Sequence, residues 1–138
     1  MKFSRREALV LALGSAAAAA IPLPALAAVE QAIADFTGGA AVAEGGITLT
    51  TPEIAENGNT VPISVEAPGA VAIMVVAAGN PTPGVCRATF GDQAGAQMFG
   101  ARIRLAGTQD VVAIAQMADG SFVRASNEVK VTIGGCGG

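Results

Sequence analysis

The most constraining stretch of the sequence is a run of nine apolar residues, AVAIMVVAA, from Ala70 to Ala78. Turn-forming residues bound it on both sides, with Pro68 and Gly69 before it and the cluster NPTPG after it. A short apolar run between turn signals is typical of a strand that is buried on both faces. The run is far shorter than the roughly 20 residues that a membrane-spanning helix needs. We therefore predict a β-strand with two buried faces here.

The neighbouring stretches also predict β-structure, because short β-rich runs alternate with turn clusters from Gly46 onward. In ARIRLAG, Ile103 and Leu105 lie on one face and Arg102 and Arg104 on the other. The stretch QDVVAIAQM follows as the next strand. About seven short strands at regular spacing in about 110 residues are typical of an immunoglobulin-like β-sandwich. The predicted fold class is therefore all-β, an antiparallel immunoglobulin-like sandwich.

Two local signals add a helix and a hairpin. In AVEQAIADFTGG, Val29, Ile33 and Phe36 have helical spacing, so we predict a short amphipathic helix that stops at the following glycines. The dipeptide Asp119-Gly120 predicts a tight hairpin turn, with positive φ at both residues, between QDVVAIAQM and a strand SFVRAS.

The first 27 residues have the organisation of an export signal. A basic start, KFSRRE, precedes an apolar run from Ala8 to Ile21, and the small residues up to Ala27 suit a signal peptidase. A transmembrane anchor is disfavoured, because the run is shorter than the roughly 20 residues of a span. Pro22 and Pro24 also interrupt the apolar segment. We expect cleavage near Ala27, which leaves a protein without a membrane anchor.

The adjacent arginines Arg5 and Arg6, with Ser4 before them and Leu9 after them, indicate the twin-arginine export route and a periplasmic location. Proteins that use this route cross the membrane already folded, and many travel with a cofactor or a partner. A small protein without cofactor ligands therefore suggests a partner protein.

Composition excludes several kinds of function. Without residues 1–27 the chain keeps five of its eight basic and ten of its eleven acidic residues, a net charge near −5 that argues against nucleic-acid binding. Histidine is absent, which excludes Ser-His-Asp and Cys-His catalysis and histidine-ligated zinc or haem. Two cysteines alone build no cysteine-only metal site. We predict no catalytic residue, no metal and no cofactor.

The final predicted strand, EVKVTI, directs Val129, Val131 and Ile133 inward and its alternate residues outward. The predicted sandwich domain therefore extends over residues 28–133.

After this strand the chain ends on a cysteine surrounded by glycines: Gly134, Gly135, Cys136, Gly137 and Gly138. Glycine has the broadest backbone freedom, and two extended residues reach about 7 Å. We interpret residues 134–138 as a swinging arm whose slim tip enters a pocket of another protein. An exposed thiol has an ordinary pKa near 8.5, so its activation must come from the enzyme that it visits.

The other cysteine, Cys86, leaves alternatives open. A buried, free and inert thiol is one interpretation, and a disulfide with Cys136 is another, since exported proteins usually pair their cysteines. Four flanking glycines argue against a structural bridge. Arg87 could lower the pKa of Cys86, but strand alternation directs the two side chains to opposite faces.

Several stretches together resemble the SoxY family, the sulfur-carrier subunits of the thiosulfate-oxidising Sox system. They are the terminal VKVTIGGCGG, PEIAENGNTVPISVEA, NPTP, RIRLAGTQDVVAIAQMADGSF and the twin-arginine signal. The resemblance extends from Ser4 to Gly138. It implies that Cys136 holds the substrate covalently, as a cysteine S-thiosulfonate or a longer sulfane chain. Separate periplasmic enzymes, including c-type cytochromes, would attach, oxidise and hydrolyse the bound sulfur.

The resemblance also implies a heterodimer with SoxZ, another immunoglobulin-like domain. This sequence departs from the simplest family pattern in carrying Cys86 besides the arm cysteine. An exposed Cys86 could trap Cys136 in a resting disulfide.

Two classes of function follow. The first is a non-catalytic carrier of thiosulfate-derived sulfur. The second is a secreted β-sandwich adaptor whose terminal cysteine forms a structural or dimerising disulfide. A thiol oxidoreductase is disfavoured, because the sequence has no Cys-x-x-Cys motif.

Overall fold

The computed structural model describes residues 24–134 of the 138-residue chain. Cys136, the cysteine of the predicted arm, and most of the predicted export signal lie outside the described residues. The elements are α2 (Pro24–Thr37), β1 (Val42–Glu44), β2 (Thr48–Thr50), β3 (Ile54–Ala55), β4 (Val61–Glu66), β5 (Ala70–Ala77), β6 (Gly84–Thr89), β7 (Met98–Ile103), β8 (Gln109–Met117) and β9 (Phe122–Val131).

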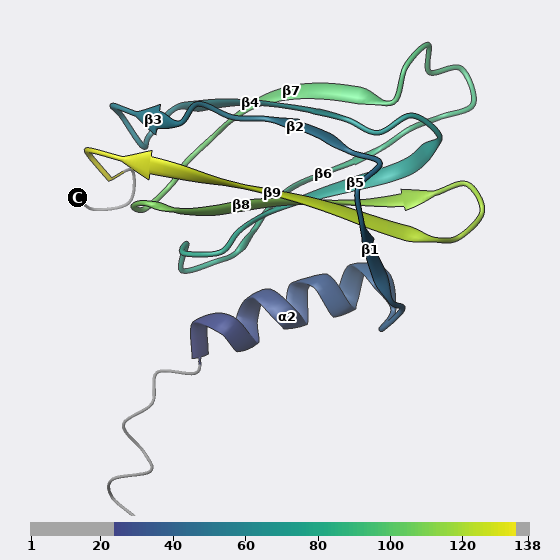
Figure 1. The fold of residues 1–138 in the computed structure, drawn as a ribbon, viewed down its shortest axis with the longest axis horizontal. Coiled ribbons are helices and arrows are strands. Elements are labelled where there is room, and N and C mark those ends of the chain that lie inside the picture. The colour runs from purple at the N-terminus through teal and green to yellow at the C-terminus, as the bar shows by residue number, and fades with distance from the viewer. Residues whose placement is uncertain (1–23, 135–138) are drawn as a thin grey trace, which may run out of the picture.

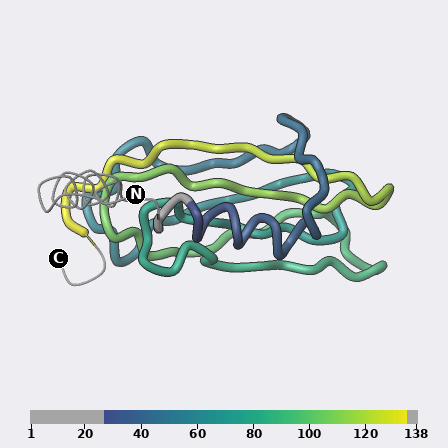
Figure 2. The backbone as a smooth tube through the Cα atoms, turned by 90° about the horizontal axis from the view of Figure 1, so that it is seen from below, coloured from purple at the N-terminus to yellow at the C-terminus, as the bar shows by residue number. Residues whose placement is uncertain are grey.

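The strands form two sheets that pack face to face, with α2 on the outer face of the larger sheet (Figure 1). The larger sheet has the order β1-β9-β8-β5-β6, with β3 also paired to β9, and the smaller sheet has the order β2-β4-β7. Figure 2, seen from the helix side, shows α2 running along the strands that it covers. The predicted sandwich and its N-terminal helix are confirmed. The strand pairing in the larger sheet is not purely antiparallel as predicted, since β1 and β3 pair with β9 in parallel.

The apolar run that dominates the sequence is β5, and apart from the exposed Val71 it is buried on both faces as predicted. Ile73 and Val75 point into the core between the two sheets, whereas Met74 and Val76 point into a second core beneath α2. The adjacent strand β8 divides its residues in the same way, with Val112 facing the helix. A strand covered by another layer on each side has no face on which a polar residue is favoured, which explains its continuous apolar sequence.

The helix has the predicted buried face. Val29 is buried, and Ile33 and Phe36 pack against the core beneath the helix. The helix ends at Thr37, and Gly38 takes a φ of 66° directly after it. The positive φ ends the helix in the left-handed region that glycine adopts without a steric penalty. The helix begins at Pro24, within the predicted signal segment.

The predicted hairpin joins β8 to β9, but its turn type differs from the prediction. Gly120 has a φ of 87°, whereas Asp119 has none of the positive φ expected of it. The Gly120 amide donates to the Met117 carbonyl at 3.0 Å, which gives a three-residue loop with glycine at its left-handed position. The Asp119 carboxylate accepts hydrogen bonds from the backbone and hydroxyl of Ser121. These bonds stabilise Asp119 in an ordinary turn conformation.

Replacing Gly120 with alanine is expected to lower the free energy of unfolding by about 1–2 kcal/mol, because an L-residue is strained in the left-handed region. No atom lies within 4 Å of the position that a Cβ would take, so the effect isolates the backbone strain. Equilibrium urea unfolding measures it. Gly91→Ala, which also has open space and lacks a positive φ, is the matched control and should be close to neutral. Equal free energies of unfolding for the two variants would show that an L-residue is not strained at position 120.

The C-terminal strand differs from the prediction in two ways. The segments SFVRAS and EVKVTI form one continuous strand, β9, that pairs with β8 along most of its length. The inward placement of Val129 and Val131 is confirmed, but that of Ile133 is wrong, since Ile133 is 61% exposed. The strand ends at Val131, so the alternation of faces does not continue to Ile133.

Candidate functional site

The site begins where β9 ends, since Gly134 is the last described residue before Cys136. Two segments hold the chain here: residues 55–58, which begin at the end of β3, and the loop of residues 104–108. The Thr132 amide donates to the Ala55 carbonyl at 3.1 Å, and the Thr132 hydroxyl donates to the Glu56 carbonyl at 2.9 Å. One residue later the Gly58 amide donates to the Ile133 carbonyl at 2.7 Å. These bonds explain why the chain turns away from the strand direction and exposes Ile133.

The loop that connects β7 to β8, residues 104–108, holds the other side of the same segment. The Thr108 hydroxyl accepts a hydrogen bond from the Val131 amide at 3.0 Å. Gly134 lies so close to the Ala106 carbonyl that a Cβ on Gly134 would overlap this oxygen. The buried Gly58 connects the two loops, because its carbonyl accepts from the Leu105 amide at 2.8 Å.

Beneath this loop lies a polar network built on Asn80 and Gln109. The Asn80 amide group donates to the Arg104 carbonyl at 2.8 Å, and its oxygen accepts from the Ala106 amide at 2.9 Å. The Gln109 amide group donates to Asn80 Oδ1 and to the Gly107 carbonyl, both at 2.9 Å. Gln109 Oε1 accepts from the Gly79 amide at 2.8 Å. The side-chain oxygens and nitrogens of both residues are therefore satisfied.

Sequence reasoning did not single out this network. The sequence predicts a turn at Asn80, and the structure confirms it. A turn asparagine, however, gives no indication of which distant carbonyl it contacts. Gln109 is buried, and the one signal for it is a polar residue at the start of an otherwise apolar strand. Buried polar side chains need partners, so this position could have been recognised as part of a polar network.

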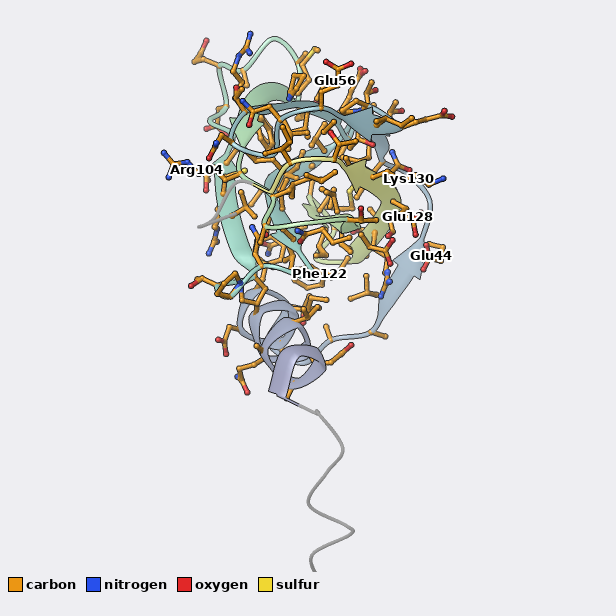
Figure 3. All side chains as sticks on the ribbon, turned by 90° about the vertical axis from the view of Figure 1, so that its left-hand side faces the viewer. Glu44, Glu56, Arg104, Phe122, Glu128 and Lys130 are labelled. Carbon is orange, nitrogen blue, oxygen red and sulfur yellow. The ribbon has the colours of Figure 1, made fainter. Side chains whose placement is uncertain are left out.

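The end of the sandwich at which β9 stops carries charges of both signs. Figure 3 looks onto this end and shows Arg104 on one side, Lys130 and Glu128 on the other and Glu56 at the top. Mixed charges do not create a strong local potential of one sign.

Cys86 lies away from this end of β9, in the middle of the edge strand β6. It pairs with Val75 of β5 and packs against the core between the sheets. Burial raises the pKa of the Cys86 thiol. Arg87 lies on the opposite face, with its guanidinium carbon 5.0 Å from the ring centroid of Phe36 in α2. The predicted separation of Cys86 from Arg87 is confirmed, and Cys86 is free and half-buried.

A pH-dependent loss of stability should follow from the burial of Cys86. Its pKa is raised on folding, so above the ordinary value of about 9 the unfolded chain releases the proton first. The free energy of unfolding should therefore fall as pH rises through this range, and fall less in Cys86→Ala. Urea unfolding of both proteins at pH 7 and pH 10 measures the difference. Identical pH dependences would show that the Cys86 thiol is not desolvated.

Within residues 24–134, no cluster of three or more cysteine, aspartate or glutamate side chains is arranged to hold a metal ion. A hollow of about 280 Å³ between α2 and β1 contains Arg124, whose Nε lies 3.2 Å from a carboxylate oxygen of Glu44. Another, of about 430 Å³, lies at the edge of β9 beside Asn127. Cys86 lines neither hollow.

No helix within residues 24–134 is long and apolar enough to cross a bilayer.

Comparison with solved structures identifies a close relative in both fold and sequence. The sulfur carrier protein SoxY from Chlorobium limicola f thiosulfatophilum is 34% identical, with a TM-score of 0.69, over 78% of this chain and 99% of that chain. A superoxide reductase (neelaredoxin) from Ignicoccus hospitalis is 16% identical, with a TM-score of 0.56, over 63% of this chain and 80% of that chain. The second likeness shows a shared fold alone.

Comparison with curated protein sequences found no match. Residues 33–136 match the protein family described as "Sulfur oxidation protein SoxY". This match includes α2 from Ile33 onward, all nine described strands and Cys136. The chain therefore belongs to the SoxY family, the sulfur carrier proteins of sulfur oxidation.

Proposed function

We propose that this chain carries thiosulfate-derived sulfur on Cys136 and presents it to separate enzymes. The observation that carries the proposal is the family match, which extends through the glycine-rich segment to Cys136. In this function residues 134–138 form the arm, with Gly134, Gly135, Gly137 and Gly138 around the cysteine. The sequence contains no histidine, and its other cysteine is half-buried in the sandwich. Both features support chemistry that takes place in the pocket of a partner.

The loading step is an oxidation. The Cys136 thiol loses its proton, and its sulfur forms a bond to the outer sulfur of thiosulfate, which gives a cysteine S-thiosulfonate. Two electrons leave in this step, and a c-type cytochrome of the enzyme that attaches thiosulfate accepts them. Hydrolysis of the terminal sulfonate by a second enzyme then releases sulfate and leaves a persulfide on Cys136. The carrier supplies the attacking sulfur and the arm, and its partners supply the oxidant and the activated water.

Export and partnership belong to the same proposal. Residues 1–27 direct the folded protein to the periplasm by the twin-arginine route, and residues 28–133 form the domain that binds a SoxZ-like subunit. Folded export suits a carrier that crosses the membrane together with this subunit. After cleavage near Ala27 the acidic chain has no membrane anchor and no affinity for nucleic acid.

Intact-mass analysis of the exported protein, copurified from cells that oxidise thiosulfate, tests the proposal. We expect a heterodimer in which this chain begins after Ala27 and carries sulfur-containing adducts that reduction removes. Peptide mapping should place the adduct on Cys136. A permanent disulfide dimer that thiosulfate and the attaching enzyme cannot load would support the adaptor function instead.

A further inference from the structure

We propose that Gly134 is the fixed root of the arm, and that the loop of residues 104–108, held by Asn80 and Gln109, positions this root. The inference rests on the proposed carrier function of Cys136 and adds a positioning role for residues that never touch the sulfur. In the sequence, Gly135 alone separates this root from Cys136.

The glycine at position 134 is required by a close approach and not by its backbone conformation. Its φ lies outside the left-handed region, so an alanine would be tolerated by the backbone itself. The obstacle is the Ala106 carbonyl oxygen, which a Cβ would overlap. A carbonyl of a hydrogen-bonded loop cannot move aside as the end of a flexible side chain can. A glycine that served only as a flexible joint would have open space around it.

The residues just before Gly134 are also fixed. Backbone groups of Val131, Thr132 and Ile133 each take part in a hydrogen bond of 2.7–3.1 Å, to Thr108, to Ala55 of β3 and to Gly58 respectively. Gly58 contributes twice, because its amide holds Ile133 and its carbonyl holds Leu105. The end of β9 and the loop of residues 104–108 therefore behave as one unit.

Asn80 and Gln109 determine where this unit lies. Asn80 holds the backbone of Arg104 and of Ala106, the two residues on either side of Leu105, whose own side chain is fully buried. Gln109 holds Gly107 and orients the Asn80 amide. Gln109 is buried and Asn80 is partly buried. A polar network whose members are all satisfied resists displacement, because breaking one bond leaves a desolvated polar group unpaired.

Because Cys136 follows the root by only two residues, the position of the root limits where the thiol can reach. Two extended residues span only about 7 Å, to which the cysteine side chain adds a little. A displacement of the root by a few ångströms is a large fraction of this reach. Productive insertion of the thiol into a partner's pocket is sensitive to such misplacement, since reacting atoms must meet within about 3–3.5 Å.

The first test compares Gly134→Ala with Gly135→Ala in the purified full chain, by amide hydrogen exchange measured with NMR. We expect the Gly58 amide, which holds Ile133, to exchange at least about tenfold faster in Gly134→Ala, because local opening becomes easier when the contact with Ala106 is disrupted. Gly135→Ala should leave this amide at its original rate. Amides of β5 should be unchanged in both variants, which shows that the fold is intact. Equal exchange of the Gly58 amide in the two variants would overturn the anchored root.

The second test measures function with the attaching enzyme and thiosulfate. In Gly134→Ala and in Asn80→Ala we expect kcat/KM for loading to fall about tenfold, because loading is proportional to the fraction of molecules whose root is correctly placed. The rate at which a small thiol reagent modifies Cys136 should stay unchanged. Asn59→Ala, an exposed asparagine in the adjacent loop, is the control and should load normally. Equal loading by Gly134→Ala and Gly135→Ala would overturn the positioning role.

The two proposals fail in different ways. If the original protein acquires no sulfur adduct, the carrier function is wrong, whereas the exchange experiment still decides whether Gly134 is anchored. If the protein loads normally and the exchange rate of the Gly58 amide does not change in Gly134→Ala, the carrier function stands and the anchored root is wrong.

Discussion

Replacing Cys136 with serine is expected to abolish sulfur loading completely. The loading step joins two sulfur atoms with loss of two electrons, and a serine hydroxyl neither ionises at neutral pH nor forms a stable bond of this kind. Intact-mass spectrometry, after incubation with thiosulfate and the attaching enzyme, should show the unmodified mass alone in Cys136→Ser. The original protein should show the adduct and should lose it on reduction.

Cys86→Ser is the matched control for this experiment. Cys86 is half-buried in β6 and lies on the core side of its strand, so its replacement should leave loading unchanged while lowering stability slightly. Loss of loading in Cys86→Ser, or an adduct on Cys136→Ser, would refute the assignment of Cys136 as the attachment site. A Cys86 to Cys136 disulfide in the resting protein would appear in the same spectra of the non-reduced sample.

Replacing Ile73 with alanine should have the largest effect on stability. Ile73 is fully buried in β5, in the core between the two sheets. Removing three carbon atoms there loses their transfer free energy and leaves a cavity, which together cost about 2–5 kcal/mol. Equilibrium urea unfolding should show a lower midpoint with an unchanged slope, since the surface exposed on unfolding hardly changes.

Val71→Ala on the same strand is the control for Ile73→Ala. Val71 is 38% exposed near the start of β5, so its truncation should cost less than about 1 kcal/mol. Similar losses for the two variants would show that β5 is not covered on its inter-sheet face. That result would contradict the three-layer arrangement of small sheet, large sheet and helix.

The parts of the fold that the sequence predicted correctly are those in which local pattern and burial agree. The run AVAIMVVAA has no polar residue on either face, and the structure covers both of its faces. The helix from Pro24 to Thr37 has the predicted apolar spacing and stops where two glycines follow. In each case the local sequence pattern is enough to indicate which side chains are buried and where the element ends.

The predictions that failed depended on interactions with distant segments. Ile133 has the alternation of an inward residue, but bonds from the loop around Gly58 turn the chain before that alternation can continue. The division of β9 into two strands failed because its partner β8 is long enough to pair along most of its length. Asp119 was expected at positive φ, yet the side-chain bonds to Ser121 favour a three-residue loop.

The sequence by itself determined the chemistry that this protein can offer: a terminal thiol among glycines, no histidine and no metal-binding motif. It also determined the layers, through the period of its apolar residues. Only the tertiary structure decided how the end of β9 is held beside Gly134, because Gly58, Asn80, Ala106, Gln109 and Gly134 come from segments that lie far apart in the sequence. The side chains of Asn80 and Gln109 bond to backbone groups of other segments, and the sequence of one segment does not indicate which distant carbonyl or amide it will meet.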